Sequence, residues 1–146
     1  MLEGQRELQL AAAGKYQIET LCFVSNLLGS SQTEMVESFP NADLVEVTQE
    51  VYTKIAYRNS TEGVLAIARG KSHDLDQLQW QSENPLILVA EAPEKPGNIG
   101  ALLRTADAAD LDAVIIASPK SDVYNPNIIR SSLGCVFPQS IATGST

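Results

Sequence analysis

The residues best suited to chemistry lie in one stretch, "KPGNIGALLRTADAADL", at positions 95–111. It holds two glycines, Gly97 and Gly100, and Arg104 follows the second glycine by four residues. A guanidinium group binds phosphate oxygens in pairs and stabilises developing negative charge. Residues four apart stack on one side of a helix, so we expect Gly100 to leave space beside Arg104 for a partner or a ligand. The spacing alone leaves open whether Arg104 meets a partner, a ligand or only solvent.

The same stretch also permits ordinary structural roles. Arg104 has Asp107 one turn further on, and an exposed ion pair of this kind contributes under about 1 kcal/mol. Asn98 is a suitable N-cap for the helix that follows. Two phosphate loops are excluded by spacing: a Walker loop needs four residues between its glycines, and a dinucleotide fingerprint needs three glycines. Gly97 and Gly100 have two residues between them and no third glycine.

The second half of the chain predicts a βαβ unit that positions this stretch. The apolar run "PLILVAEA" reads as a strand buried in a parallel sheet, and "DAVIIAS" reads as a second one. The helix between them has an apolar face, and "NPNIIRSS" predicts a short helix after the second strand. The members of that apolar face are Ile99, Leu102, Leu103 and Ala106. A sheet of two or three strands exposes its edges, which indicates a dimer partner or a longer protein.

The first half alternates helices and strands as well. Strands are predicted at 18–24, 43–47 and 63–69, and helices at 3–13, 30–39 and 49–56, the last capped by Thr48. Residues 1–70 therefore form a first α/β domain. Residues 71–84 are polar and predict a linker, in which His73 is a solvent-exposed loop residue. Residues 85–146 form the second unit.

Composition narrows the class of protein. The 146 residues carry a net charge of −8, and residues 1–83 hold 6 basic against 12 acidic side chains, so no broad basic surface is available for nucleic acid. RNA contacts would come from local basic residues such as Lys54, Arg58, Arg69 and Lys71. No apolar run approaches the roughly 18 residues that cross a membrane. One histidine and two distant cysteines disfavour zinc, and the cysteines read as reduced thiols of a cytoplasmic protein.

The stretch at 95–111 resembles the first motif of the SpoU (TrmH-type) RNA ribose 2′-O-methyltransferases of the SPOUT superfamily. That motif is roughly N-x-G-x-x-x-R-x-A, and Asn98, Gly100, Arg104 and Ala106 match it. The segment "NPNIIRSSLGCVF" resembles the next motif, R-x-S-x-G, through Arg130, Ser132 and Gly134. The family usually has a glycine at the position of Asp110. The N-terminal half resembles the ribosomal-protein-like domain that precedes many SpoU catalytic domains.

The resemblance implies a fold and a reaction. The fold is a small ribosomal-protein-like α/β substrate-binding domain, followed by the N-terminal part of a SPOUT (α/β-knot) parallel-sheet domain. The reaction is transfer of a methyl group from S-adenosylmethionine to a ribose 2′-hydroxyl of rRNA or tRNA, by a homodimer without a metal. Arg104 would hold the target phosphate and stabilise the alkoxide, and Asn98 would orient the site. Arg130, Ser132, Arg58 and Lys54 would contact RNA.

Besides Asp110, a second departure from the family pattern shapes the hypotheses. The family's later motifs, a G-x-E-x-x-G loop and an S-L-N segment, do not occur, and they build most of the cofactor pocket. The chain is therefore expected to be an N-terminal portion of a methyltransferase, inactive alone and unable to bind S-adenosylmethionine usefully. One alternative is a non-catalytic RNA-binding module with a degenerate methyltransferase-like appendage. A third hypothesis is an unrelated small α/β protein that binds a nucleotide.

Overall fold

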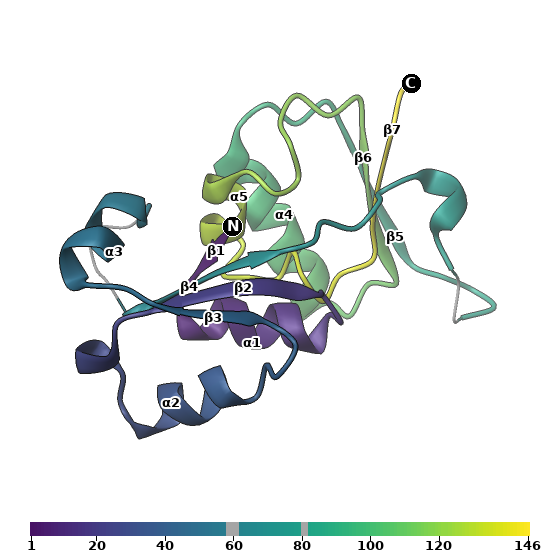
Figure 1. The fold of residues 1–146 in the computed structure, drawn as a ribbon. Coiled ribbons are helices and arrows are strands. Elements are labelled where there is room, and N and C mark those ends of the chain that lie inside the picture. The colour runs from purple at the N-terminus through teal and green to yellow at the C-terminus, as the bar shows by residue number, and fades with distance from the viewer. Residues whose placement is uncertain (58–61, 80–81) are drawn as a thin grey trace. The chain divides into compact units, whose positions relative to one another are not determined.

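The computed structural model describes residues 1–57, 62–79 and 82–146 (Figure 1). The chain forms two compact units, Met1–Arg69 and Gly70–Thr146. Residues 71–79, from the segment expected to be a linker, belong to the second unit, as does Gly70, which was expected to end the first domain. Each unit has its own sheet, and the two sheets differ in topology.

The first unit is a mixed four-stranded sheet with helices. Its strand order is β1-β4-β2-β3; β2 and β3 run parallel, and β4 is antiparallel to both β1 and β2. The predicted helices and strands are all present, and the two-residue β1 was not predicted because it is too short to show a period. The elements are β1 (Leu2–Glu3), α1 (Gln5–Ala13), β2 (Ile18–Phe23), the 3₁₀ turn η1 (Ser25–Leu27), α2 (Ser30–Glu37), β3 (Asp43–Glu46), α3 (Gln49–Ile55) and β4 (Val64–Ala68).

Tyr52 joins α3 to the sheet of the first unit. Its side chain is fully buried, and its hydroxyl donates to the carbonyl of Val64 in β4 at 3.0 Å. Thr48 caps α3 as predicted, because its hydroxyl accepts from the backbone N–H of Val51 at 3.3 Å. The start of α3 is thus fixed by its cap, and its packing against the sheet is fixed by Tyr52.

The second unit contains the predicted βαβ arrangement. Its parallel sheet has the order β5-β6-β7, and α4 connects β5 to β6. The third strand, β7, had no sequence signal beyond its short run of small and apolar residues. The elements are the 3₁₀ turn η2 (Leu75–Gln77), β5 (Ile87–Glu91), α4 (Pro96–Ala108), β6 (Ala113–Ala117), α5 (Pro126–Ser131) and β7 (Ile141–Gly144).

The two predicted buried strands differ in burial. β6 lies between β5 and β7 and is largely buried, as expected. β5 is an edge strand, and Val89 is 63% exposed, so the prediction that β5 is fully buried is wrong within this unit. Leu86, just before β5, is 62% exposed. The expectation of an exposed apolar sheet edge is confirmed on the β5 side.

The ends of α4 correct one prediction and confirm another. The helix starts at Pro96 with Lys95 as its N-cap residue, so Asn98 lies in the first turn and is not the cap. Proline at the first position fits because its missing N–H has no helical partner there. Beyond the other end, Asp110 has a φ of 50°, the left-handed conformation expected of the residue that replaces the family's glycine. Ile99, Leu103 and Ala106 are buried on the predicted face.

Candidate RNA-contact site in the second unit

At Gly100, α4 lies very close to Ser131 of α5. A Cβ atom built there would lie 2.7 Å from both the Cβ and the carbonyl carbon of Ser131. Real Cβ atoms do not come so close, so only glycine permits this packing. The expected space beside Arg104 is therefore filled by α5, and the prediction that Gly100 leaves room for a ligand is wrong.

Arg104 turns toward α5 and not toward Asp107. Its guanidinium donates a hydrogen bond to the carbonyl oxygen of Ser131. Asp107 accepts instead from the Gln139 amide at 3.3 Å and from the Cys135 thiol at 3.6 Å. The ion pair considered for Arg104 is absent, and within residues 1–57, 62–79 and 82–146 this arginine has no carboxylate partner. Its charge remains available at an exposed position.

A pocket of about 470 Å³ opens where α4 and α5 meet, and we call it the arginine pocket. Arg104 and Arg130 both line it, together with the polar side chains of Asn127 and Ser131. No acidic side chain lines this pocket. Two guanidinium groups without a carboxylate form a site that attracts a phosphate or another anion.

The site residues predicted from sequence fall into three groups. The structure brings Arg104 and Arg130 together in the arginine pocket. Asn98 is exposed in the first turn of α4 and does not line that pocket. Lys54 is exposed in the last turn of α3 in the first unit, and Arg58 lies outside the described residues.

Ser132 requires a correction, because its side chain does not reach the surface. The residue is 0% exposed, and its hydroxyl donates to the carbonyl of Ile129 at 3.0 Å. Direct contact between this hydroxyl and RNA is incompatible with its burial. The preceding Ser131 faces the arginine pocket instead. The motif resemblance favoured Ser132, and α5 is too short for a helical period to show which of the adjacent serines is buried.

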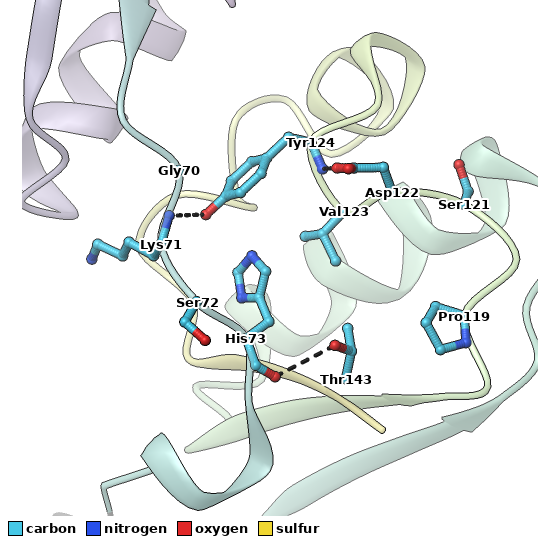
Figure 2. A pocket seen from close by; sticks show the side chains of 10 residues that line it. All are labelled: Gly70, Lys71, Ser72, His73, Pro119, Ser121, Asp122, Val123, Tyr124 and Thr143. Carbon is cyan, nitrogen blue, oxygen red and sulfur yellow. Dashed lines mark hydrogen bonds between the residues drawn. The ribbon is translucent and has the colours of Figure 1, made fainter. Parts of the chain in front are cut away.

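A second pocket of the same unit, about 440 Å³, surrounds His73, and we call it the His73 pocket (Figure 2). The Nδ1 atom of His73 is 3.0 Å from the carbonyl oxygen of Ile141, and the His73 carbonyl accepts from the Thr143 backbone N–H at 2.7 Å. The ring is half-buried and packs against Tyr124. The prediction of a solvent-exposed loop histidine is therefore wrong: the segment pairs with β7.

Across the parts of the chain that the structure describes, no helix is long and apolar enough to cross a membrane. The same parts hold no group of three or more His, Cys, Asp or Glu side chains placed to bind a metal ion.

Family models match both halves of the chain. Residues 85–145 match the SpoU rRNA methylase family, and residues 1–66 match the MRM3-like substrate binding domain. Residues 85–145 are thus a SpoU methylase domain, and residues 1–66 are an MRM3-like substrate binding domain. The family resemblance and the fold class predicted from sequence are thereby confirmed.

Named relatives of this SpoU chain act on RNA. It is 28% identical over 146 residues to the 23S rRNA (uridine(2479)-2′-O)-methyltransferase of Streptomyces viridochromogenes, covering 94% of this chain and 48% of that protein. An AdoMet-bound rRNA methyltransferase structure from Sinorhizobium meliloti aligns with a TM-score of 0.83 and 25% identity, over 99% of this chain and 54% of that one.

A crystal structure of an RNA 2′-O ribose methyltransferase is also similar, with a TM-score of 0.76 and 35% identity. The alignment covers 99% of this chain and 54% of that one. The chain thus spans about half the length of the relatives and structures it matches.

Proposed function

We propose that this SpoU chain is the RNA-contacting portion of an S-adenosylmethionine-dependent ribose 2′-O-methyltransferase. The observation that carries the proposal is the pairing of Arg104 and Arg130 in one pocket lined by no carboxylate. The family match and the names of the relatives supply the reaction class. Ribosomal RNA is favoured over tRNA as substrate, because the relatives cited above are rRNA or unspecified RNA enzymes.

Within that reaction, the arginines position the substrate. A guanidinium forms two parallel hydrogen bonds to a phosphate, and it stays protonated at any working pH. Arg104 is therefore assigned to holding the phosphate beside the target ribose and to stabilising the alkoxide that forms at the 2′-oxygen. A role as the base that removes the proton is unsuitable for a permanently charged group. Arg130 is assigned to the same or the neighbouring phosphate, and Ser131 to a supporting hydrogen bond.

When bound, S-adenosylmethionine would supply the methyl group from its sulfonium. The arginine pocket is not assigned to this cofactor: its guanidinium groups suit the cofactor's carboxylate, but its lining offers no acidic side chain to the sulfonium and ammonium charges. We therefore assign no cofactor-binding residue in this chain. We propose instead that the cofactor is held by the complete protein and that this chain alone is inactive.

The first unit is proposed to bind the RNA substrate, as its match to a substrate binding domain suggests. Lys54 is its candidate contact, exposed at the end of α3, where its charge also favours the helix dipole. Arg58 is proposed on the sequence alone. Asn98 keeps its proposed role in orienting neighbouring loops.

We further propose a cytoplasmic homodimer. Cys22 and Cys135 are free thiols, as a reducing compartment requires. The exposed apolar side chains of Leu86 and Val89 mark the β5 side as a surface that a partner would cover. Sedimentation velocity measures the oligomeric state directly, and a protein that stays monomeric at every concentration contradicts the proposed dimer.

The test of the proposed function is RNA binding by Arg104→Ala and Arg130→Ala variants. Each is expected to weaken binding of a fluorescein-labelled single-stranded 12-mer RNA and to reduce the slope of log K against log salt by about 1. Arg6→Ala is the matched control, since Arg6 is an exposed arginine of α1 in the first unit and has no proposed RNA contact. Equal affinities and slopes for all three variants would remove the arginine pocket from the site.

An assay of methyl transfer distinguishes the enzyme hypothesis from the hypothesis of a non-catalytic RNA-binding module. The longest natural protein that contains these residues is incubated with tritiated S-adenosylmethionine and rRNA. The enzyme proposal predicts tritium on ribose 2′-oxygens, and a loss of at least about tenfold with Arg104→Ala. RNA binding without any methyl transfer would favour the RNA-binding module.

A further inference from the structure

The His73 pocket lies where ligands bind in open parallel sheets. The loop after β6 provides Pro119, Ser121 and Val123, and Thr143 comes from the last residues of β7. The pocket therefore opens at the carboxyl ends of two parallel strands. Its volume of about 440 Å³ falls in the range of small-molecule sites (Figure 2). None of the roles proposed above uses it.

Two rings form a wall of this pocket, and one of them is held firmly. The centroids of the His73 and Tyr124 rings are 5.1 Å apart with the planes at 41°. The Tyr124 hydroxyl accepts a hydrogen bond from the Lys71 backbone N–H at 3.0 Å. The backbone N–H of Tyr124 donates to the Asp122 carboxylate at 2.6 Å. A Cβ on Gly70 would come within 3.2 Å of the Tyr124 ring, so the chain passes closely beside it. Such a fixed aromatic side chain is a platform for stacking.

His73 supplies a hydrogen-bond acceptor at the same place. The carbonyl of Ile141 can only accept, so Nδ1 carries the hydrogen in that bond and Nε2 of the neutral ring is an acceptor. Nε2 is buried and has no hydrogen-bond partner among the described residues. Figure 2 shows the imidazole directed toward Tyr124. A ligand with an N–H group that reaches Nε2 would satisfy it.

These groups together favour a nucleobase over a free anion. The acceptor Nε2 and the Asp122 carboxylate both disfavour negative charge inside the pocket. A nucleobase is flat, neutral and edged with N–H groups, so it can stack on Tyr124 and donate to His73. Lys71, exposed in the lining, can then bind the phosphate attached to that nucleotide.

We propose that the His73 pocket binds an unstacked base of the RNA substrate, one or a few nucleotides from the phosphate held by the arginine pocket. This inference rests on the proposed function. Tyr124 lies just before α5, and Arg130 and Ser131 lie at its other end. Six helical residues span roughly 9 Å, so one RNA strand can reach both pockets. This continuity favours RNA over a free nucleotide as the source of the base.

The test compares two substitutions of Tyr124 in the full chain. The probes are a fluorescein-labelled 12-mer of mixed sequence and the same 12-mer with abasic sites throughout. Tyr124→Leu removes the ring and is expected to weaken binding of the base-containing RNA about 5- to 100-fold, with no change for the abasic RNA. Tyr124→Phe keeps the ring but loses the bond to Lys71, and is expected to bind like the wild type.

The outcomes separate this inference from the proposed function. Arg130→Ala should weaken binding of both probes, whereas Tyr124→Leu should affect only the one with bases. If Arg130→Ala weakens binding and Tyr124→Leu does not, the base pocket is overturned and the proposed function stands. If Tyr124→Phe is as weak as Tyr124→Leu, the residue is only a structural clamp on the 70–73 segment, and the inference fails.

Three further measurements test the remaining alternatives. The unfolding midpoint of each variant in urea shows whether it folds, and a 2-aminopurine in the RNA reports stacking by quenching in the wild type and in Tyr124→Phe. Absence of quenching in the wild type overturns the inference. If AMP or UMP alone binds as tightly as the 12-mer, the pocket binds a free nucleotide, and the claim that its base comes from RNA is refuted. A wild-type chain that binds neither probe overturns both proposals.

Discussion

At the scale of single residues, glycine decides how α4 meets α5. Gly100 and Gly97 belong to the same helix and looked alike in the sequence. Their surroundings differ: an added Cβ at Gly100 meets the Ser131 backbone, whereas at Gly97 it meets nothing within 4 Å. The family motif containing Gly100 therefore has a packing reason here, and Arg104 reaches the Ser131 carbonyl because the helices come so close.

The contrast gives a stability prediction. Gly100→Ala is expected to lower the free energy of unfolding by about 1–3 kcal/mol, because the backbone of Ser131 cannot move aside as a flexible side chain would. Gly97→Ala is the control and should be neutral or stabilising by up to about 1 kcal/mol, since alanine favours the helix. Urea titration measures both. Similar values for the two variants would contradict the packing argument.

The adjacent serines show what single residues in a sequence cannot reveal. The R-x-S-x-G resemblance pointed to Ser132, yet Ser132 is buried and Ser131 lines the arginine pocket. Both have the same side chain and both lie at the end of a six-residue helix. Which serine is buried depends on which face of α5 packs against α4. That is tertiary information, and no local pattern carries it.

At the scale of elements, local signals were most reliable where a helix or strand had its own period or cap. The apolar face of α4 and the Thr48 cap of α3 are examples. The strands β1 and β7 were not predicted from the sequence, and the predicted burial of β5 was too high. Their character depends on neighbours distant in sequence, as when the 73–74 segment pairs with Thr143 and carries His73 inward.

The cap of α3 yields a prediction for this element. Thr48→Ala removes the acceptor for the Val51 N–H and is expected to cost about 1 kcal/mol of stability. Thr53→Ala in the same helix is the matched control. The Thr53 hydroxyl only bonds back to the Gln49 carbonyl, so alanine there should be neutral or slightly stabilising. Thermal denaturation of both variants measures the difference, and a larger loss for Thr53→Ala would refute the capping role.

At the scale of the whole molecule, the two units divide the proposed task unevenly. Basic side chains are few, and the net charge is −8, so long-range attraction of RNA is weak. Specific binding must then rely on local groups: the two guanidinium groups of the arginine pocket, Lys54 in α3, and the rings of the His73 pocket. This explains why composition alone disfavoured a nucleic-acid binder while the site geometry supports one.

The last prediction concerns the cofactor. The chain spans 54% of the AdoMet-bound structure it resembles, and its arginine pocket offers no acidic side chain to a sulfonium. Calorimetry is therefore expected to show a dissociation constant for S-adenosylmethionine weaker than about 1 mM, which corresponds to roughly 4 kcal/mol of binding. The Sinorhizobium meliloti enzyme serves as the positive control. Micromolar binding by these 146 residues would mean that they contain a cofactor site that neither pocket provides, and the division between RNA contact and cofactor binding would have to be redrawn.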